Sequence, residues 1–186
     1  IRDSVGRASS AHNKPEGATT VAPSALRART QLFTDTVGMV DTDEPRALSL
    51  QEIAQVIEEY RQAALNAREA GFDGVELHCT SGYLPMQFMA SGSNLRDDQY
   101  GGSVENRVRF PAQVLAAMAS AIGAGRVALR LCPGNPFNDI DDEDPMATAV
   151  ALCKAAEPMG LAYVHIMRSP LAELDAFALA LSLIHI

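Results

Sequence analysis

The succession of an amphipathic helix, a glycine and a short apolar strand occurs three times along this chain. This repeated pattern constrains the fold more than any other feature of the sequence. Each amphipathic helical pattern ends at one or two glycines, and the predicted strands then cover 74–78, 127–131 and 162–166. Strands that alternate with helices pair in parallel through crossover connections. The pattern is therefore typical of an arc of a (β/α)8 barrel or of a doubly wound open sheet. No G-x-G-x-x-G sequence follows a predicted strand, which weakens the dinucleotide-binding form of the open sheet.

Local capping signals mark the ends of the predicted helices. Ser49 and Glu52 form an S-x-x-E capping box, after which apolar residues recur at helical spacing. Gly71 stands where a C-cap glycine would end this first helix. Asp144 and Pro145 predict the start of the third helix, because aspartate is a favoured N-cap and proline is tolerated at the first helical position.

Three stretches depart from this regular plan. Residues 1–48 are punctuated by proline and glycine and look irregular, which is unusual for a compact domain unless such a loop is functional or packed on something else. Ser103 is expected to cap the second helix, in which Pro111 should cause a kink or a split near Phe110 because proline lacks a backbone donor. Residues 171–180 have the composition of a further helix.

The composition disfavours several classes of function. Fifteen basic and 23 acidic residues give a net charge of −8, which argues against binding to a nucleic-acid backbone or to an anionic membrane surface. No apolar run reaches the roughly 18 residues of a membrane span, and no secretory signal is visible at the first residues. Cys79, Cys132 and Cys153 are far apart and odd in number, so we expect reduced thiols in a cytoplasmic protein.

Polar residues at the ends of the predicted strands are the candidates for chemistry, because parallel α/β folds place their sites there. His78 ends the first strand, and an imidazole in that position can donate a hydrogen bond to a carbonyl or an oxyanion. Tyr83 follows in the adjoining loop and has a phenol that can deliver a proton. By position alone, a structural histidine and a packed aromatic residue are the favoured interpretation.

Arg130 lies within an otherwise apolar strand and needs a partner there, since a charge is rarely buried alone. That partner would be a carboxylate in an internal salt bridge, a phosphate or an electron-rich ligand, and the sequence does not choose among them. His165 in the third strand is interpreted as a core or supporting residue. The acidic run over 139–144 lacks the ligand spacing of a calcium loop and predicts a solvated loop with a helix N-cap.

A long ordered string of residues carries a more specific signal. Its members are Ala70-Gly71-Phe72-Asp73-Gly74-Val75-Glu76-Leu77-His78, Gly82-Tyr83-Leu84, Gln87-Phe88, Ser93-Asn94, Arg96, Asp98, Tyr100-Gly101-Gly102-Ser103, Glu105-Asn106-Arg107 and Arg109-Phe110. Further matches are Val21-Ala22-Pro23-Ser24-Ala25, Pro45-Arg46-Ala47-Leu48, Leu129-Arg130-Leu131 and Phe137-Asn138-Asp139. Together they resemble the old yellow enzyme family of flavin-dependent ene-reductases over about residues 5–178.

The resemblance implies a partial (β/α)8 TIM barrel, in which this chain forms about the middle half. Residues 1–180 would be a partial FMN-dependent oxidoreductase domain, and residues 181–186 would be a non-native tail. The first residues also depart from the family, because Ile1 stands where a flavin-binding glutamine is common.

The resemblance also implies an activity and a set of site residues. NAD(P)H would reduce non-covalently bound FMN, and the flavin would pass a hydride to an activated alkene, a small-molecule substrate. His78 would bind the carbonyl or nitro oxygen of the substrate, Tyr83 would protonate the α-carbon of the alkene, and Arg130 would lie beside the flavin ring. Ser81 replaces the asparagine or histidine that supplies the second oxygen contact in the family, and its hydroxyl is shorter. No metal is implied.

Two function classes remain open at this point. The first is an FMN-dependent ene-reductase represented by a fragment, with the isolated fragment inactive because the phosphate-binding loops of the family come from its final strands. The second is a non-catalytic barrel remnant that binds no flavin, since an open arc exposes strand edges and apolar faces.

Overall fold

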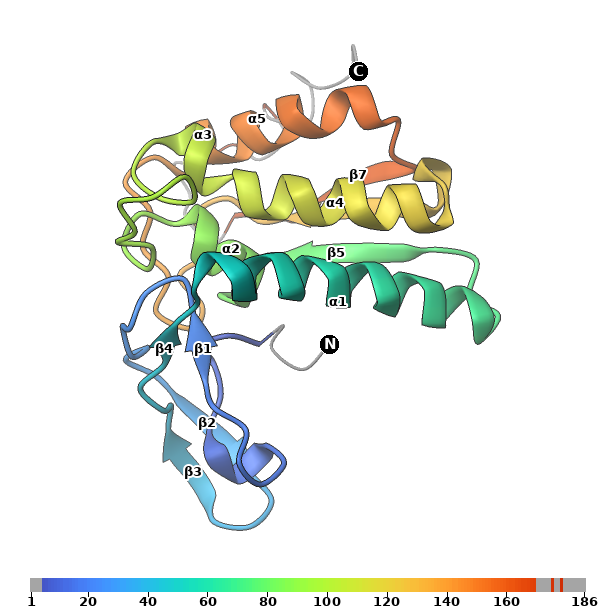
Figure 1. Cartoon of the computed structure of the whole chain (residues 1–186). Coiled ribbons are helices and arrows are strands. Elements are labelled where there is room, and N and C mark those ends of the chain that lie inside the picture. Colours follow the sequence, from blue (N-terminus) through green and yellow to red (C-terminus); the bar gives the residue numbers. More distant parts are fainter. Residues whose placement is uncertain (1–4, 170–174, 176–177, 179–186) are drawn as a thin grey trace.

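A parallel β-sheet lies at the centre of the computed structural model, which describes residues 5–169 together with 175 and 178. Among these residues the central sheet has the strand order β5 (Val75–Cys79), β6 (Val127–Leu131), β7 (Tyr163–Ile166), with both pairs parallel (Figure 1). The predicted parallel pairing is therefore confirmed. The helix expected over 171–180 lies outside the described residues apart from two positions. The proposed tail 181–186 and the first four residues also lie outside them.

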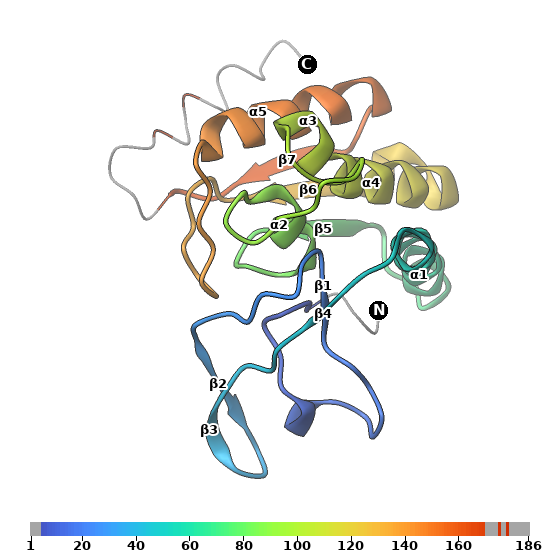
Figure 2. The same ribbon diagram turned by 60° about the vertical axis from the view of Figure 1, so that its left-hand side comes forward.

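Helices cover one face of this sheet. They are α1 (Leu50–Glu69), α4 (Arg109–Ile122) and α5 (Pro145–Ala156) (Figures 1 and 2). The apolar side chains of Leu77, Leu129 and Leu131 point from the strands into one core with residues of these helices, such as Phe110 and Leu115. The opposite face has no helix over it in the described part of the chain. This arrangement of parallel strands and helices is that of a partial (β/α)8 barrel.

The helix caps that the sequence predicts are present in the structure. Ser49 Oγ accepts a hydrogen bond from the Glu52 amide at 3.3 Å, and Glu52 Oε2 accepts one from the Ser49 amide at 2.8 Å. Gly71 follows the end of α1 with a φ of 93°, and Asp144 caps α5 through the Ala147 amide. No candidate for a membrane-spanning helix is found in the part of the chain that the structure describes.

The second predicted helix is divided earlier than expected. Ser103 caps the short helix α3 (Val104–Arg107), and the helical path breaks at Val108 rather than near Phe110. Pro111 lies in the first turn of α4, where its missing N–H leaves the carbonyl one turn earlier without a helical partner. The break therefore falls about one turn before the proline.

The interpretation of residues 1–48 as irregular is wrong in part. They contain a 3-10 helix, a β-hairpin and two short strands. These are η1 (Ala11–Asn13), β1 (Val21–Ala22), β2 (Gln31–Thr34), β3 (Gly38–Asp41) and β4 (Arg46–Ala47). Strand β1 pairs with β4 in parallel, and β2 pairs with β3 as a hairpin that projects away from the central sheet (Figure 2). The two-residue strands β1 and β4 are too short for a sequence pattern to identify, and the hairpin strands lack the helix and glycine that precede the equally short β7.

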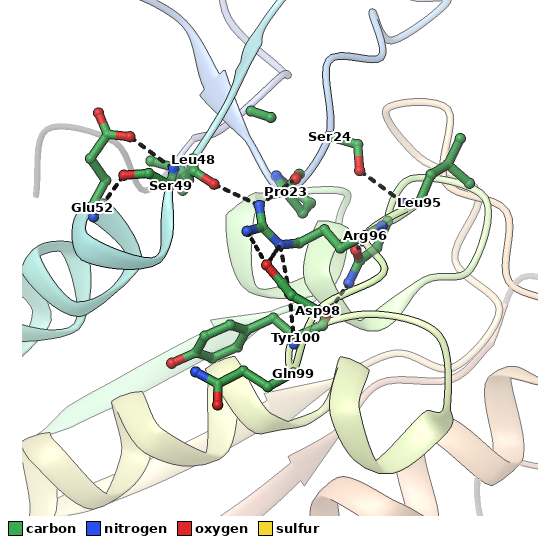
Figure 3. A network of polar contacts seen from close by, with 12 residues as sticks. Pro23, Ser24, Leu48, Ser49, Glu52, Leu95, Arg96, Asp98, Gln99 and Tyr100 are labelled. Atoms are coloured by element: carbon green, nitrogen blue, oxygen red, sulfur yellow. Dashed lines mark hydrogen bonds and ion pairs between the residues drawn. The ribbon is translucent and has the colours of Figure 1, made fainter.

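One arginine joins this N-terminal segment to the barrel part of the chain. Arg96 Nη1 donates to the carbonyl of Pro23 at 2.9 Å and to that of Leu48 at 2.6 Å, and its guanidinium also pairs with Asp98 at 2.5 Å (Figure 3). The Leu95 amide donates to Ser24 Oγ at 2.9 Å in the same network. The segment before α1 is thereby fixed against the loop that follows α2 (Leu84–Met89).

Candidate functional site

His78 and Arg130 are opposite each other on neighbouring strands, and both lie on the sheet face that the helices leave uncovered. The parallel register pairs His78 of β5 with Arg130 of β6. Side chains alternate between the two faces of a strand. Because Leu77 and Leu129 belong to the core beneath the helices, the two polar residues that follow them point to the other face.

Tyr83 reaches the same region from the loop after β5. Its ring centroid lies 5.5 Å from that of His78, with an angle of 45° between the ring planes. A pocket of about 340 Å³ beside β5 is lined by both rings, with Val5, Tyr60 and Met118 among the other lining residues. The histidine and the tyrosine that the sequence singles out are thus brought together at one cavity.

Ser81 occupies the turn between these two rings and adopts an unusual backbone conformation. Its φ is 58°, in the left-handed region that residues other than glycine rarely adopt, and Gly82 follows with a φ of 70°. A Cβ atom at Gly82 would overlap the carbonyl of Phe137, so only glycine fits there. The turn redirects the chain from β5 into α2, for which Tyr83 is the N-cap residue.

The electrostatic surroundings of His78 favour its neutral form. Partial burial lowers the pKa of His78 and the charge of Arg130 lowers it further, while Glu76 opposes them. A neutral imidazole carries one N–H donor and one acceptor nitrogen. Near neutral pH, His78 can therefore donate a hydrogen bond to a ligand oxygen without bringing a positive charge to it.

Arg130 has weak partners within the described residues. Its Nε and Nη2 atoms lie 3.2 and 3.1 Å from the thioether sulfur of Met167, and its Nη1 atom lies 3.9 Å from Glu76. Of the three kinds of partner that the sequence left open, a carboxylate is present at salt-bridge distance, and the Nε and Nη2 donors contact a thioether. A thioether is a poor acceptor, so the guanidinium retains the capacity to contact an electron-rich ligand.

Glu76 is a member of this polar group that sequence reasoning missed. Its Oε2 atom lies 3.2 Å from Nδ1 of His165. The signal was present, because Glu76 lies two residues before His78 in an apolar strand and must share its face. Of the two interpretations of His165, that of a core residue is wrong, since its side chain is 43% exposed on the uncovered face. The contact with Glu76 agrees with the other, a supporting residue.

The acidic run after β6 is only partly the solvated loop that was predicted. Asp144 caps α5 as expected, but Asp139 pairs with Arg29 at 3.0 Å and Asp142 pairs with the buried Arg107 at 3.3 Å. Within the described part of the chain, no group of three or more His, Cys, Asp or Glu residues could hold a metal ion.

Curated relatives of the chain are reductases by name. It is 41% identical over 181 residues to a probable flavin mononucleotide-dependent alkene reductase of Leishmania infantum, covering 93% of this chain and 50% of the relative. It is 40% identical to 12-oxophytodienoate reductase 7 of Oryza sativa subsp. japonica, covering 87% of this chain and 43% of that protein. The chain therefore spans about half the length of the curated relatives it matches.

Solved structures agree with the fold. Morphinone reductase in complex with tetrahydroNAD superposes with a TM-score of 0.84 at 45% identity, covering 87% of this chain and 46% of the other. An old yellow enzyme homologue from Zymomonas mobilis gives a TM-score of 0.83 at 34% identity, covering 88% of this chain and 45% of the other. The sequence profile of one family matches residues 4–176. The chain therefore belongs to the NADH:flavin oxidoreductase / NADH oxidase family, the old yellow enzyme family that its sequence resembles.

Proposed function

We propose that the protein carrying this chain is an FMN-dependent reductase that uses NAD(P)H to saturate alkenes activated by a carbonyl or nitro group. The observation that carries this proposal is the convergence of His78, Tyr83 and Arg130. The first two rings lie 5.5 Å apart, and the arginine is the register neighbour of the histidine. Family membership and the names of the relatives support the same reaction class.

The residues of this chain would polarise the substrate and supply a proton. His78 would donate a hydrogen bond to the carbonyl or nitro oxygen and stabilise the charge that develops there. Ser81 would give that oxygen a second, shorter donor. Tyr83 would deliver a proton to the α-carbon. With a hydride added at the β-carbon, the carbon–carbon double bond becomes a single bond and NAD(P)H becomes NAD(P)+.

Arg130 is the residue of this chain that would contact the flavin. When bound, FMN supplies the two-electron chemistry that links NAD(P)H to the alkene. The guanidinium fits the electron-rich edge of the flavin ring, because its closest acceptors among the described residues are a thioether at 3.1 Å and a carboxylate at 3.9 Å. A cation held there favours the anionic reduced ring.

The net charge and the cysteines support proposals about the partners and the compartment of this protein. We propose a small-molecule substrate and no nucleic-acid or membrane partner, because the net charge of −8 repels both polyanionic surfaces. The thiols of Cys79, Cys132 and Cys153 are free and buried, which supports a reducing compartment such as the cytoplasm. Residues 1–186 alone should not turn over, because relatives have about twice this length.

The test compares the full-length protein with its Tyr83→Phe variant. We expect the purified protein to show flavin absorbance and to reduce an α,β-unsaturated ketone at the expense of NAD(P)H. Tyr83→Phe should slow alkene reduction and leave flavin reduction by NAD(P)H largely intact, because only the former needs its proton. A colourless, inactive full-length protein would contradict the proposal and favour a non-catalytic remnant that binds no flavin.

A further inference from the structure

Two side-chain carboxamides hold consecutive carbonyl groups of the loop between β5 and α2. Asn138 Nδ2 donates to the carbonyl of Ser81 at 2.8 Å, and Gln87 Nε2 donates to the carbonyl of Gly82 at 2.7 Å. Both residues of the turn have positive φ angles, which are unfavourable for serine. The unfavourable conformation at Ser81 is thus held from two sides by groups that lie outside the turn.

The Gln87 side chain is fully buried, and both the nitrogen and the oxygen of its carboxamide make hydrogen bonds. Besides Gly82, its Nε2 atom donates to the carbonyl of Val5 at 3.1 Å, while its Oε1 atom accepts from the Arg7 amide at 3.1 Å. The backbone at Gly6 approaches so closely that a Cβ atom there would overlap the Gln87 amide. Gln87 therefore ties the turn after β5 to the segment that precedes the hairpin.

Asn138 is fixed from the opposite direction. Both Asn138 and Asp139 have a φ of 60°. The Asp139 carboxylate accepts from the Arg29 amide at 3.0 Å and from Arg29 Nε at 3.1 Å, and Arg7 Nη2 donates to the Asp139 carbonyl. Arg7 thereby closes a ring of contacts that runs through Gln87, the turn and the loop at 138–139.

We propose that Gln87 and Asn138 are positioning residues for alkene reduction, an inference that rests on the proposed function. His78 is fixed by the register of the sheet, whereas Ser81 and Tyr83 belong to the turn that the two amides hold. Loss of either amide donor should let the turn relax toward ordinary backbone angles. Ser81 and Tyr83 would then move relative to His78, while the strand residues stay in place.

The test uses two substitutions at one position in the full-length protein loaded with FMN. Asn138→Gly removes the donor to Ser81 and keeps a residue that tolerates positive φ, so it separates the hydrogen bond from backbone strain. Asn138→Asp keeps the size and also visits the left-handed region, but a carboxylate cannot donate. Asn66→Asp makes the same chemical change on the exposed surface of α1 and is the matched control.

We expect both Asn138 variants to lower the single-turnover rate of alkene reduction by about tenfold or more, because a small misplacement of reacting groups is costly. Flavin reduction by NAD(P)H should fall much less than alkene reduction, since it takes no proton from Tyr83. Hydrogen exchange of the amides at 80–86 should accelerate, a readout that is independent of activity. Asn66→Asp should leave all three quantities unchanged.

The outcomes separate the two proposals. Equal losses in both half-reactions, an unchanged rate of alkene reduction, or unchanged exchange at 80–86 would overturn the positioning role. If one variant fails to fold, the other decides. An unsubstituted full-length protein that binds no flavin or reduces no alkene would instead overturn the proposed function.

Discussion

Arg107 and Asp142 form an ion pair that is almost entirely removed from water. The two side chains are 9% and 8% exposed, and Nη2 lies 3.3 Å from Oδ1. The guanidinium also donates to the carbonyls of Met89 and Gly102, each at 2.7 Å. The pair therefore fastens the acidic loop after β6 to the helices that precede it.

Arg107→Met should destabilise the protein strongly. The substitution removes the cationic partner of Asp142, which keeps only the Ser91 amide at 3.2 Å as a donor, and it removes the guanidinium donors to two carbonyl groups. Breaking a buried pair in this way typically lowers the unfolding free energy by about 3–5 kcal/mol. Urea denaturation of the full-length protein measures the effect. Arg61→Met is the control, because Arg61 pairs with Glu58 on the exposed surface of α1 and its loss should change stability little. If Arg107→Met and Arg61→Met lowered the unfolding free energy equally, burial of the Arg107–Asp142 pair would not be the cause of its large contribution.

The N-terminal cap of α1 should make stability depend on acid pH. The Arg46 guanidinium and the Ser49 amide lower the pKa of Glu52 from 4.5 to about 2. Because the folded pKa lies below the unfolded one, the contribution of Glu52 is fully present above pH 4.5 and is lost as the pH falls through about 2.

The melting temperatures of the parent and of Glu52→Gln should therefore differ at neutral pH and converge over that acid window. Thermal unfolding followed by circular dichroism measures both. Glu16→Gln removes the same charge at an exposed position and is the control for net charge. A gap between parent and Glu52→Gln that stays constant to pH 2 would show that the cap does not titrate as expected.

The pKa of His78 should shift in opposite directions in response to two substitutions on the same face of the sheet. Arg130 lowers the pKa of His78 and Glu76 raises it. Arg130→Met should therefore raise the His78 pKa, and Glu76→Gln should lower it further. Titration of the imidazole Cε1 proton by NMR measures both shifts. Shifts of the same sign would mean that a conformational change, rather than charge, dominates.

The order of strands and helices could be predicted because its signals are local. Gly71 and the Ser49 capping box act within a few residues of the ends they define, so a sequence pattern contains the whole cause. The hairpin was missed because no helix and glycine precede its strands, as they do the equally short β7, and the β1–β4 pair was missed because its strands have two residues each. The β1–β4 pair also depends on partners far along the chain.

The candidate site was predictable only in its parts. His78 and Tyr83 are five residues apart, and the resemblance identified them together. The contact between Glu76 and His165 joins residues 89 positions apart, and that between Asn138 and Ser81 joins residues 57 apart. Such contacts depend on strand register and on loop packing, which the sequence does not encode in any local pattern.

Ser81→Asn should strengthen binding of a carbonyl ligand in the full-length protein. The position has a φ of 58°, and asparagine adopts the left-handed region more readily than serine does. Its carboxamide also extends farther than a hydroxyl, so it can donate to the ligand oxygen that His78 would bind. A hydrogen bond contributes about 0.5–1.5 kcal/mol net, which corresponds to a two- to tenfold lower dissociation constant, roughly.

Calorimetric titration with an unreactive cyclic ketone measures the dissociation constant for the parent, Ser81→Asn and Ser81→Ala. Ser81→Ala should bind more weakly, because it removes the hydroxyl donor and keeps the small side chain. If asparagine leaves affinity unchanged while alanine weakens it, the serine hydroxyl already makes the full contact. If neither substitution changes affinity, residue 81 does not contact the ligand oxygen, and the oxygen-binding role proposed for Ser81 is wrong.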